Sequence, residues 1–287
     1  MRPPTAAPGR PAHRARGAGR APGAWRFQPS WLWRWVVLIA GVGAWQLWAS
    51  GHHSPFFPPP SAILARMYHL WFSGPVRHVF LTADATGNLL PSIWRTLAGL
   101  AIATAIGIPL GIAIGRSRAV SGYLEPLLQF GRALPVVTLA PVFLALFKIG
   151  TQMEVATIAF GTVWPILLNT IDGARSVDPV QLETARAFRL SRGQRLTQLI
   201  IPSAMPKIFT GFRLSLSLAL ILMVFSELVG SSNGIGYEML NAQNSFDLTE
   251  LWCTIVVLGI LGYLLNAILN GVQRVALSWH RGVREAG

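Results

Sequence analysis

Hydrophobic residues along this chain are gathered into long stretches that polar segments separate. A helix rises about 1.5 Å per residue, so roughly 20 apolar residues are needed to cross about 30 Å of hydrocarbon. The pattern predicts six transmembrane helices, at approximately residues 31–50, 93–115, 127–148, 152–171, 207–230 and 251–272. The third is the weakest, because Arg132 lies near its start. We therefore predict an all-α, polytopic membrane protein.

The segments around the first stretch have a different composition. Residues 1–30 are rich in Arg, Pro, Ala and Gly and predict a disordered basic arm. The stretch at 31–50 is longer than the core of a signal peptide, so we interpret it as an uncleaved helix. Residues 51–91 are expected outside the cytoplasm and include a proline-rich run that cannot span a membrane. Ser61 is expected to cap a short amphipathic helix there. Its apolar residues are Ile63, Leu64, Met67, Leu70 and Trp71.

The charge distribution predicts the topology. The chain is 52% hydrophobic and 12% charged, with a formal net charge of +13, whereas a soluble domain carries about 25% charged residues. Most arginines fall in alternate connecting segments, which the positive-inside rule places in the cytoplasm together with both termini. The outside segments hold little beyond Arg66, Arg77, Arg95 and Lys148. Because the arginines lie between apolar stretches, we expect the lipid bilayer and not a nucleic acid as partner. The later helices form a core at 92–275, followed by a cytoplasmic tail at 276–287.

One face of the second predicted helix consists of small residues. Positions four apart along a helix share a face, and small side chains there let two backbones approach closely within a membrane. We interpret this face as a helix-packing surface. Its members are Gly99, Ala103, Gly107, Gly111 and Gly115.

A few polar residues lie inside the predicted helices. Such groups are costly in hydrocarbon and normally face protein or water. The candidates for a translocation pathway are Asn169, Glu227, Asn266 and Asn270. For Asn266 and Asn270, hydrogen bonds between helices are the slightly favoured alternative, and for Glu227 the alternative is that it reaches the outer interface. Glu154 lies at the outer start of the fourth helix.

The segment at 172–206 joins two predicted helices on the cytoplasmic side and is much longer than a turn. Its pattern predicts two short helices, the first beginning at Pro179 and the second ending before Pro202. Capping boxes mark their starts: Asp178 with Gln181, and Ser191 with Gln194. Two rigid, capped helices outside the membrane would present apolar side chains to a partner.

This segment carries a resemblance to a known family. The run from Glu183 to Arg189, followed by Ile200-Ile201-Pro202, resembles the Glu-Ala-Ala loop of binding-protein-dependent ATP-binding-cassette permeases. The resemblance extends over about residues 55–275 and looks like the sulfonate, taurine and nitrate branch. The supporting motifs are Leu134-Pro135, Ala140-Pro141, Pro165 with Asn169, Glu227-Leu228-Val229-Gly230, and the run from Ser231 to Tyr237.

The resemblance implies a coupling helix that docks in a cleft of an ATPase subunit. Carried over to this chain, the coupling residues are Glu183, Thr184, Ala185, Ala187, Arg189 and Pro202. Two positions depart from the family pattern. Thr184 replaces an alanine, and Arg189 replaces a glycine that would permit a left-handed turn without steric cost. We therefore expect the bend after this helix to be shaped differently.

The resemblance also implies partners. A phosphate-binding loop of the form G-x-x-x-x-G-K-[ST] is absent, and the only lysines are Lys148 and Lys207. We expect no catalytic residue and no cofactor in this chain, with ATP and Mg²⁺ bound by two copies of a separate ATPase subunit. An extracytoplasmic substrate-binding protein, a permease homodimer and a bacterial inner-membrane location are implied likewise. The favoured substrate is an alkanesulfonate or taurine, with nitrate, bicarbonate or a thiamine precursor as open alternatives.

The sequence fits two other classes of membrane protein less well. An ion-coupled secondary transporter usually contains internal repeats, and none is evident here. An integral-membrane enzyme would need a constellation of catalytic or metal-binding groups. The histidines of the outer segment, at His52, His53, His69 and His78, match no metal-binding spacing. We therefore expect no metal site and favour the importer permease.

Overall fold

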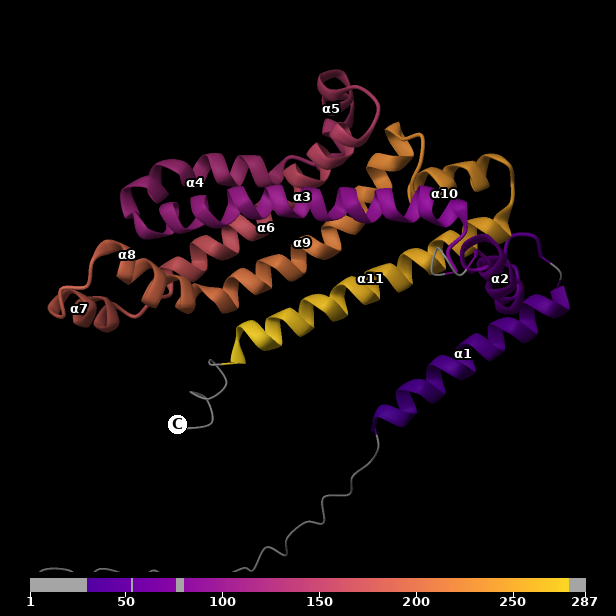
Figure 1. The fold of residues 1–287 in the computed structure, drawn as a ribbon, viewed down its shortest axis with the longest axis horizontal. Helices are drawn as coiled ribbons and strands as arrows, with labels where there is room; N and C mark the ends of the chain where they lie inside the picture. The colour runs from indigo at the N-terminus through magenta and orange to yellow at the C-terminus, as the bar shows by residue number, and fades with distance from the viewer. Residues whose placement is uncertain (1–29, 53, 76–79, 279–287) are drawn as a thin grey trace, which may run out of the picture. The chain divides into compact units, whose positions relative to one another are not determined.

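The computed structural model describes residues 30–52, 54–75 and 80–278, and every regular element in these ranges is helical. The predicted arm at 1–30, apart from its last residue, and most of the predicted tail lie outside the described residues, as do His53 and His78. The helices are α1 (Ser30–His52), α2 (Pro60–Met67), α3 (Ala83–Arg116), α4 (Arg118–Ala133), α5 (Ala140–Phe147), α6 (Thr151–Arg175), α7 (Pro179–Ala187), α8 (Arg192–Arg195), α9 (Ile201–Gly230), α10 (Ile235–Asn244) and α11 (Leu248–Ala276) (Figure 1). The prediction of an all-α fold is confirmed.

The chain divides into two compact units, at 1–44 and 45–287. Most of α1 belongs to the first unit, and α1 covers the same residues as the first predicted span. In the second unit, four described helices are long and apolar enough to cross a membrane, or five if one bent pair counts as a span. The four are α3, α6, α11 and the continuous run from α8 to α9. The predicted total of six spans stays a prediction.

The third predicted span is not one straight helix. Helix α4 ends at Ala133, a 3₁₀ turn follows at Val136–Leu139, and α5 then leaves at an angle of 81°. Proline disfavours helical geometry in the residue before it, and Leu134 is accordingly extended, with φ −67° and ψ 120°. A proline inside a span is expected to bend its helix, and here the span predicted at 127–148 is bent so far that it becomes two separate helices.

The end predicted before Pro202 is also wrong. Helix α8 continues through a π-helical turn at Leu196–Ile200 directly into α9. Proline normally interrupts a helix because it lacks an N–H and its ring meets the carbonyl four residues earlier. Here the wider turn, in which the Ile201 N–H bonds to the Leu196 carbonyl, precedes the proline. Helix α8 and the following membrane helix α9 are therefore one continuous rod.

The short helix of the outer segment begins two residues earlier than predicted. Pro59 occupies the cap position of α2 and Pro60 its first turn, so Ser61 is not the cap. The Ser61 hydroxyl instead accepts a hydrogen bond from the Gln46 side chain at 3.0 Å. A π-helical turn at Tyr68–Phe72 extends α2 and buries Trp71. Helix α3 then starts at Ala83, well before the predicted span.

The bundle is built on α3, α6 and α9. The small-residue face of α3 lies against α6, and Ala103 is fully buried. A β-carbon placed on Gly99 would stand 2.5 Å from a methyl carbon of Ile158, and one on Gly111 would stand 2.6 Å from Thr170. Gly107 and Gly115 meet α6 in the same way. Larger residues on this face would force the two helices apart, and with them the residues described below.

Candidate functional site

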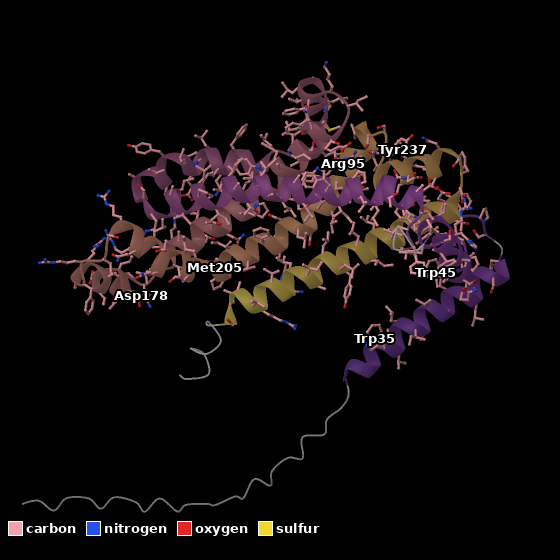
Figure 2. The ribbon with its side chains drawn as sticks, in the orientation of Figure 1. Trp35, Trp45, Arg95, Asp178, Met205 and Tyr237 are labelled. Carbon is pink, nitrogen blue, oxygen red and sulfur yellow. The ribbon has the colours of Figure 1, made fainter. Side chains whose placement is uncertain are left out.

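The α7–α8 loop lies at one end of the bundle, beyond the end of α3 and α6, and α10 lies at the other (Figure 1). Asp178 caps α7, because its carboxylate accepts a hydrogen bond from the Val180 N–H at 2.8 Å. Pro179 is the first helical residue, as predicted. Gln181 makes no capping bond among the described residues and the Asp178 bond goes to Val180, so the predicted box with Gln181 is not formed although Asp178 does cap the helix. Figure 2 labels Asp178 at this end and Arg95 and Tyr237 toward the other.

The second predicted capping box is confirmed. The Gln194 N–H donates to the Ser191 hydroxyl at 3.2 Å, and the Ser191 N–H donates to the Gln194 side chain at 2.8 Å. Reciprocal bonds of this kind satisfy two donors that a helix start leaves free. The start of α8 is therefore fixed relative to the preceding turn.

The bend after α7 is left-handed, contrary to the expectation for Arg189. This residue has φ +54°, its N–H bonds to the Arg186 carbonyl, and the Leu190 N–H bonds to the Ala185 carbonyl. This pair of bonds is the Schellman arrangement, in which glycine usually occupies the left-handed position. A side chain in that position costs about 1–2 kcal/mol. The loop keeps the glycine-type geometry because the two hydrogen bonds and the capped α8 hold it.

The candidate coupling residues do not all face the same way. Glu183, Thr184 and Ala187 are exposed, whereas Ala185 is only 6% exposed and packs within the chain. Two large apolar side chains extend the exposed face of α7, which we call the docking face: Val180, Glu183, Thr184, Ala187 and Phe188. Val180 is 66% and Phe188 78% exposed. These positions recur at helical spacing on one side, so they form one surface suited to a partner. The sequence pattern does not indicate this role for Phe188.

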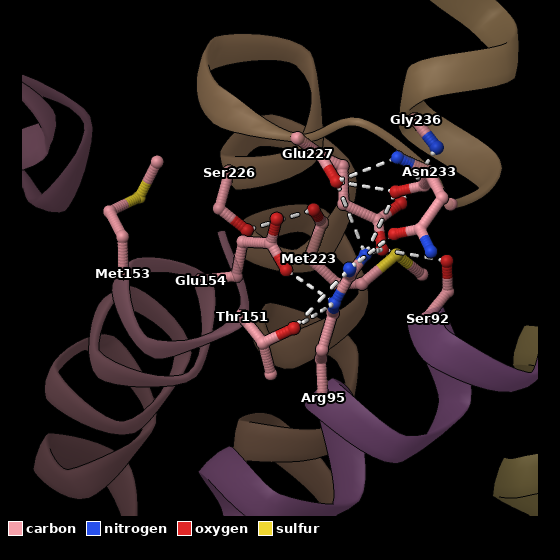
Figure 3. A network of polar contacts seen from close by, with 12 residues as sticks. Ser92, Arg95, Thr151, Met153, Glu154, Met223, Ser226, Glu227, Asn233 and Gly236 are labelled. Atoms are coloured by element: carbon pink, nitrogen blue, oxygen red, sulfur yellow. Dashed lines mark hydrogen bonds and ion pairs between the residues drawn. The ribbon is translucent and has the colours of Figure 1, made fainter. Parts of the chain in front are cut away.

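A buried polar network lies toward the opposite end of the bundle (Figure 3). Arg95 on α3 is 4% exposed and forms ion pairs with Glu154 on α6 and Glu227 on α9. The Arg95 Nη1 atom lies 2.9 Å from the Glu227 Oε1 atom. The ion pair with Arg95 is the main compensation for the burial of Glu154. One guanidinium thus holds together the three central helices.

The same network holds the turn between α9 and α10. Arg95 donates to the Asn233 carbonyl at 2.9 Å, and the Gly236 N–H donates to Glu227 at 2.8 Å. Ser92 donates to Glu227 at 2.7 Å and accepts from the Ile235 N–H at 2.9 Å. Glu227 therefore does not reach the outer interface, as one sequence interpretation held, but is enclosed at 1% exposure.

Gly234 in this turn has a conformation that other residues avoid. Its φ is +122°, and a β-carbon there would stand 2.4 Å from the Glu227 carboxyl carbon. We expect Gly234→Ala to lower the thermal stability of the detergent-solubilised chain clearly, because strain of this kind costs about 1–3 kcal/mol before the clash is added.

The matched control for Gly234→Ala is Gly259→Ala in α11. A β-carbon on Gly259 has no neighbour within 4 Å, and alanine favours a helix over glycine by about 1 kcal/mol. This variant should be as stable as the wild type or more stable. Equal loss of stability in both variants would contradict the assigned role of Gly234.

Glu238 also lies at this end, on α10 and therefore outside the membrane-spanning helices. The Asn88 side chain donates to the Glu238 carboxylate at 2.5 Å and accepts from the Gly234 N–H at 2.9 Å. Burial raises the pKa of Glu238 above its ordinary value, and the nearby Glu250 carboxylate adds to the shift. Asn88 thereby ties α10 to α3 beside the Arg95 network.

The predicted pathway residues separate into two levels of the bundle. Asn270 on α11 accepts a hydrogen bond from Arg213 on α9 at 2.9 Å. Asn169 is half-buried and donates to the Pro165 carbonyl at 2.8 Å, beside the part of α9 that carries Arg213. Asn266 is half-buried one turn before Asn270.

Glu227 does not belong to this group. It is fourteen residues after Arg213 on the same helix, which corresponds to roughly 21 Å. The hydropathy pattern gave no indication of Arg213, because this residue lies within a strongly apolar stretch. Among the described residues, no group of three or more His, Cys, Asp and Glu side chains could hold a metal ion.

Together, these features define a multi-pass helical membrane protein with a rigid, exposed docking element at one end. Residues 107–278 match the family described as the inner membrane component of binding-protein-dependent transport systems, and the chain belongs to this family. The chain is a multi-pass inner membrane protein and the permease subunit of an ATP-binding-cassette importer.

Curated relatives place the chain in the sulfonate, taurine and nitrate branch of these permeases. It is 31% identical to the aliphatic sulfonates transport permease protein SsuC of Bacillus subtilis, covering 71% of this chain and 74% of that protein. It is 30% identical to the taurine transport system permease protein TauC of Escherichia coli, covering 88% and 94%. It is 28% identical to the nitrate import permease protein NrtB of Synechocystis, covering 84% and 88%.

A solved structure shares the fold. An inward-facing conformation of the MetNI methionine ABC transporter aligns with a TM-score of 0.57 and 17% identity, covering 66% of this chain and 94% of that chain. At this identity the likeness concerns the fold alone.

Proposed function

We propose that this chain forms the translocation pathway for a small sulfonate, such as an alkanesulfonate or taurine, and is driven by a separate ATPase that grips α7. The observation that carries the proposal is the docking face: Val180 and Phe188 are large, apolar and exposed on a capped helix outside the membrane-spanning rods. Exposed aromatic side chains surrounded by smaller residues are typical of interface centres.

Movement of α7 would pass directly to the membrane helices. Leu182 on α7 packs on a small apolar cluster that contains Val177 and Ile200. Ile200 belongs to the rod that runs without interruption from Arg192 to Gly230. A displacement of the docking face on ATP binding would therefore tilt α9, which carries both Arg213 and Glu227.

The proposed partners supply what this chain does not contain. This chain lacks a phosphate-binding loop, so ATP and Mg²⁺ would be bound by two copies of the ATPase. The permease would act as a homodimer, with an extracytoplasmic binding protein delivering the substrate. Both termini and the α7–α8 loop would lie in the cytoplasm, in agreement with the arginine distribution.

The proposed substrate rests on two observations: the substrates for which similar proteins are named, and the positive charge of Arg213. The proteins named for sulfonate, taurine, nitrate and bicarbonate transport are similar to this chain at about equal identity. Arg213 is a cation within a membrane helix whose bonds go to the neutral Asn270 and Gln273. A guanidinium with neutral partners can still form a charge-assisted bond to an anion. We propose that Arg213 assists passage of the sulfonate group.

Reconstitution tests this function. The chain, its ATPase and its binding protein are placed in proteoliposomes, and ATP-dependent uptake of labelled taurine, an alkanesulfonate and nitrate is compared. We expect sulfonate uptake and no ATP hydrolysis by the chain alone. Arg213→Gln should reduce uptake at least several-fold, whereas Lys207→Gln, which removes an exposed cation from the same helix, should not.

Two outcomes would count against the proposal in different ways. ATP turnover by the isolated chain would overturn the subunit assignment. Uptake of nitrate but of neither sulfonate would overturn the substrate while leaving the permease role intact.

A further inference from the structure

A cavity of about 820 Å³ lies between the end of α3 and the α7–α8 loop. Its wall on α3 is formed by Pro109, Ile112 and Ala113, and the loop adds three aliphatic side chains. Three arginines complete the lining, Arg116 from α3 and Arg192 and Arg195 from α8. Acidic side chains are absent from this lining. The cavity therefore combines a mainly apolar wall with concentrated positive charge.

The arginines have no acidic partner among the residues that the structure describes. The Nε atom of Arg195 is buried and lacks a hydrogen-bond acceptor among the described residues. A buried donor without an acceptor is destabilising. An anion in the cavity would supply the missing acceptor and balance the charge.

The arrangement along α3 indicates what kind of anion fits. Pro109 lies seven residues before Arg116, which places it roughly 10 Å deeper along the helix. The same helix face continues beyond Pro109 with exposed Ile102 and Ile106. Arg116 stands at the end of the apolar span, where a membrane meets water. The site thus has charge at the surface level and a hydrocarbon-lined track beneath it.

We propose that this cavity binds an anionic phospholipid, with its phosphate on Arg116, Arg192 and Arg195 and an acyl chain along the exposed face of α3. Basic pockets beside membrane helices recognise lipid headgroups in this manner. A free phosphate would use the arginines but leave the apolar wall uncovered. The bound lipid would brace the α7–α8 loop against α3. This inference does not depend on the transported substrate or on which side of the membrane the loop faces.

The test uses the full-length chain in detergent and native mass spectrometry. Dioleoylphosphatidylglycerol and dioleoylphosphatidylcholine are titrated separately, with glycerol phosphate as a headgroup without chains. We expect phosphatidylglycerol to bind about tenfold tighter or more, since each basic residue near a membrane surface contributes about a fivefold preference for anionic lipid. Glycerol phosphate should bind far more weakly than phosphatidylglycerol.

Three variants locate the site. Combined Arg116→Gln, Arg192→Gln and Arg195→Gln should remove the preference for phosphatidylglycerol, and Ala113→Phe should lower its retention by filling the cavity without changing charge. Lys207→Gln, an exposed cation outside the cavity, should bind as the wild type does. Size-exclusion profiles confirm that each variant is folded.

Several results would overturn the proposal. Equal binding of the two lipids, or an unchanged preference in the triple variant, would show that the arginines do not select the headgroup. Glycerol phosphate binding as tightly as the lipid would assign the site to a soluble anion. Loss of the lipid when the ATPase is added would assign the cavity to that interface.

Discussion

Replacing Arg95 with methionine is expected to destabilise the folded chain by about 3–5 kcal/mol, the usual cost of breaking a buried ion pair. The substitution would leave Glu154 and Glu227 buried without a counter-charge and release the turn that carries Asn233. Thermal unfolding of the detergent-solubilised protein, followed by fluorescence-detected size exclusion, measures the effect.

The chain offers a matched control in Arg66. This residue also pairs with two carboxylates, those of Asp247 and Glu250, but its side chain is 44% exposed. Arg66→Met should therefore change stability by only about 0–1 kcal/mol. Combining Arg95→Met with Glu154→Gln and Glu227→Gln should recover part of the loss. Equal effects of the two arginine substitutions would contradict the structural role of the buried network.

The second large effect is expected at the docking face. Phe188→Ala should weaken association with the ATPase by at least about thirtyfold, because an exposed aromatic at an interface centre typically contributes 2 kcal/mol or more. ATP-dependent uptake should fall in parallel, while membrane insertion and thermal stability stay unchanged. Co-purification of the tagged chain with its ATPase measures the association directly.

Phe246→Ala is the control for this substitution. Phe246 is exposed to a similar degree but follows the last residue of α10 by two positions, and α10 lies at the other end of the bundle (Figure 1). The variant should retain the ATPase. If both phenylalanine variants bind the ATPase as well as the wild type, α7 is not the docking element. A companion pair sharpens the result: Ala187→Trp should block docking, whereas Ala185→Trp should first lower stability, because that side chain is buried.

Hydropathy and helix caps were sufficient to predict much of the fold. The apolar runs of α3, α6, α9 and α11 are long enough to identify a membrane helix from composition alone. The caps Asp178 and Ser191 were predictable because they depend on neighbouring residues only. The main failure occurred at a proline, because its effect depends on the adjacent turn: the chain bends at Leu134-Pro135, as a proline inside a span predicts, but continues through Pro202.

The candidate site was less predictable because its groups come from distant parts of the sequence. Arg95, Glu154 and Glu227 were each recognised as lying near the outer ends of their helices, but they were considered separately. The outer ends of all membrane-spanning helices lie at the same depth in the membrane. A buried ion pair between these residues could therefore have been inferred from the predicted topology. The solvent exposure of Phe188 and the burial of Ala185 had no comparable indication, because both depend on how α7 packs.

The location of the α7–α8 loop tests the account most directly. The native Cys253 is buried, so a cysteine introduced at the exposed Arg186 can be labelled against a low background. We predict that a membrane-impermeant maleimide labels Arg186→Cys only after the cells are lysed, whereas Gln243→Cys at the opposite end is labelled in intact spheroplasts. Labelling of Arg186→Cys in intact spheroplasts would place the loop outside the cytoplasm, beyond reach of any ATPase, and would contradict the account.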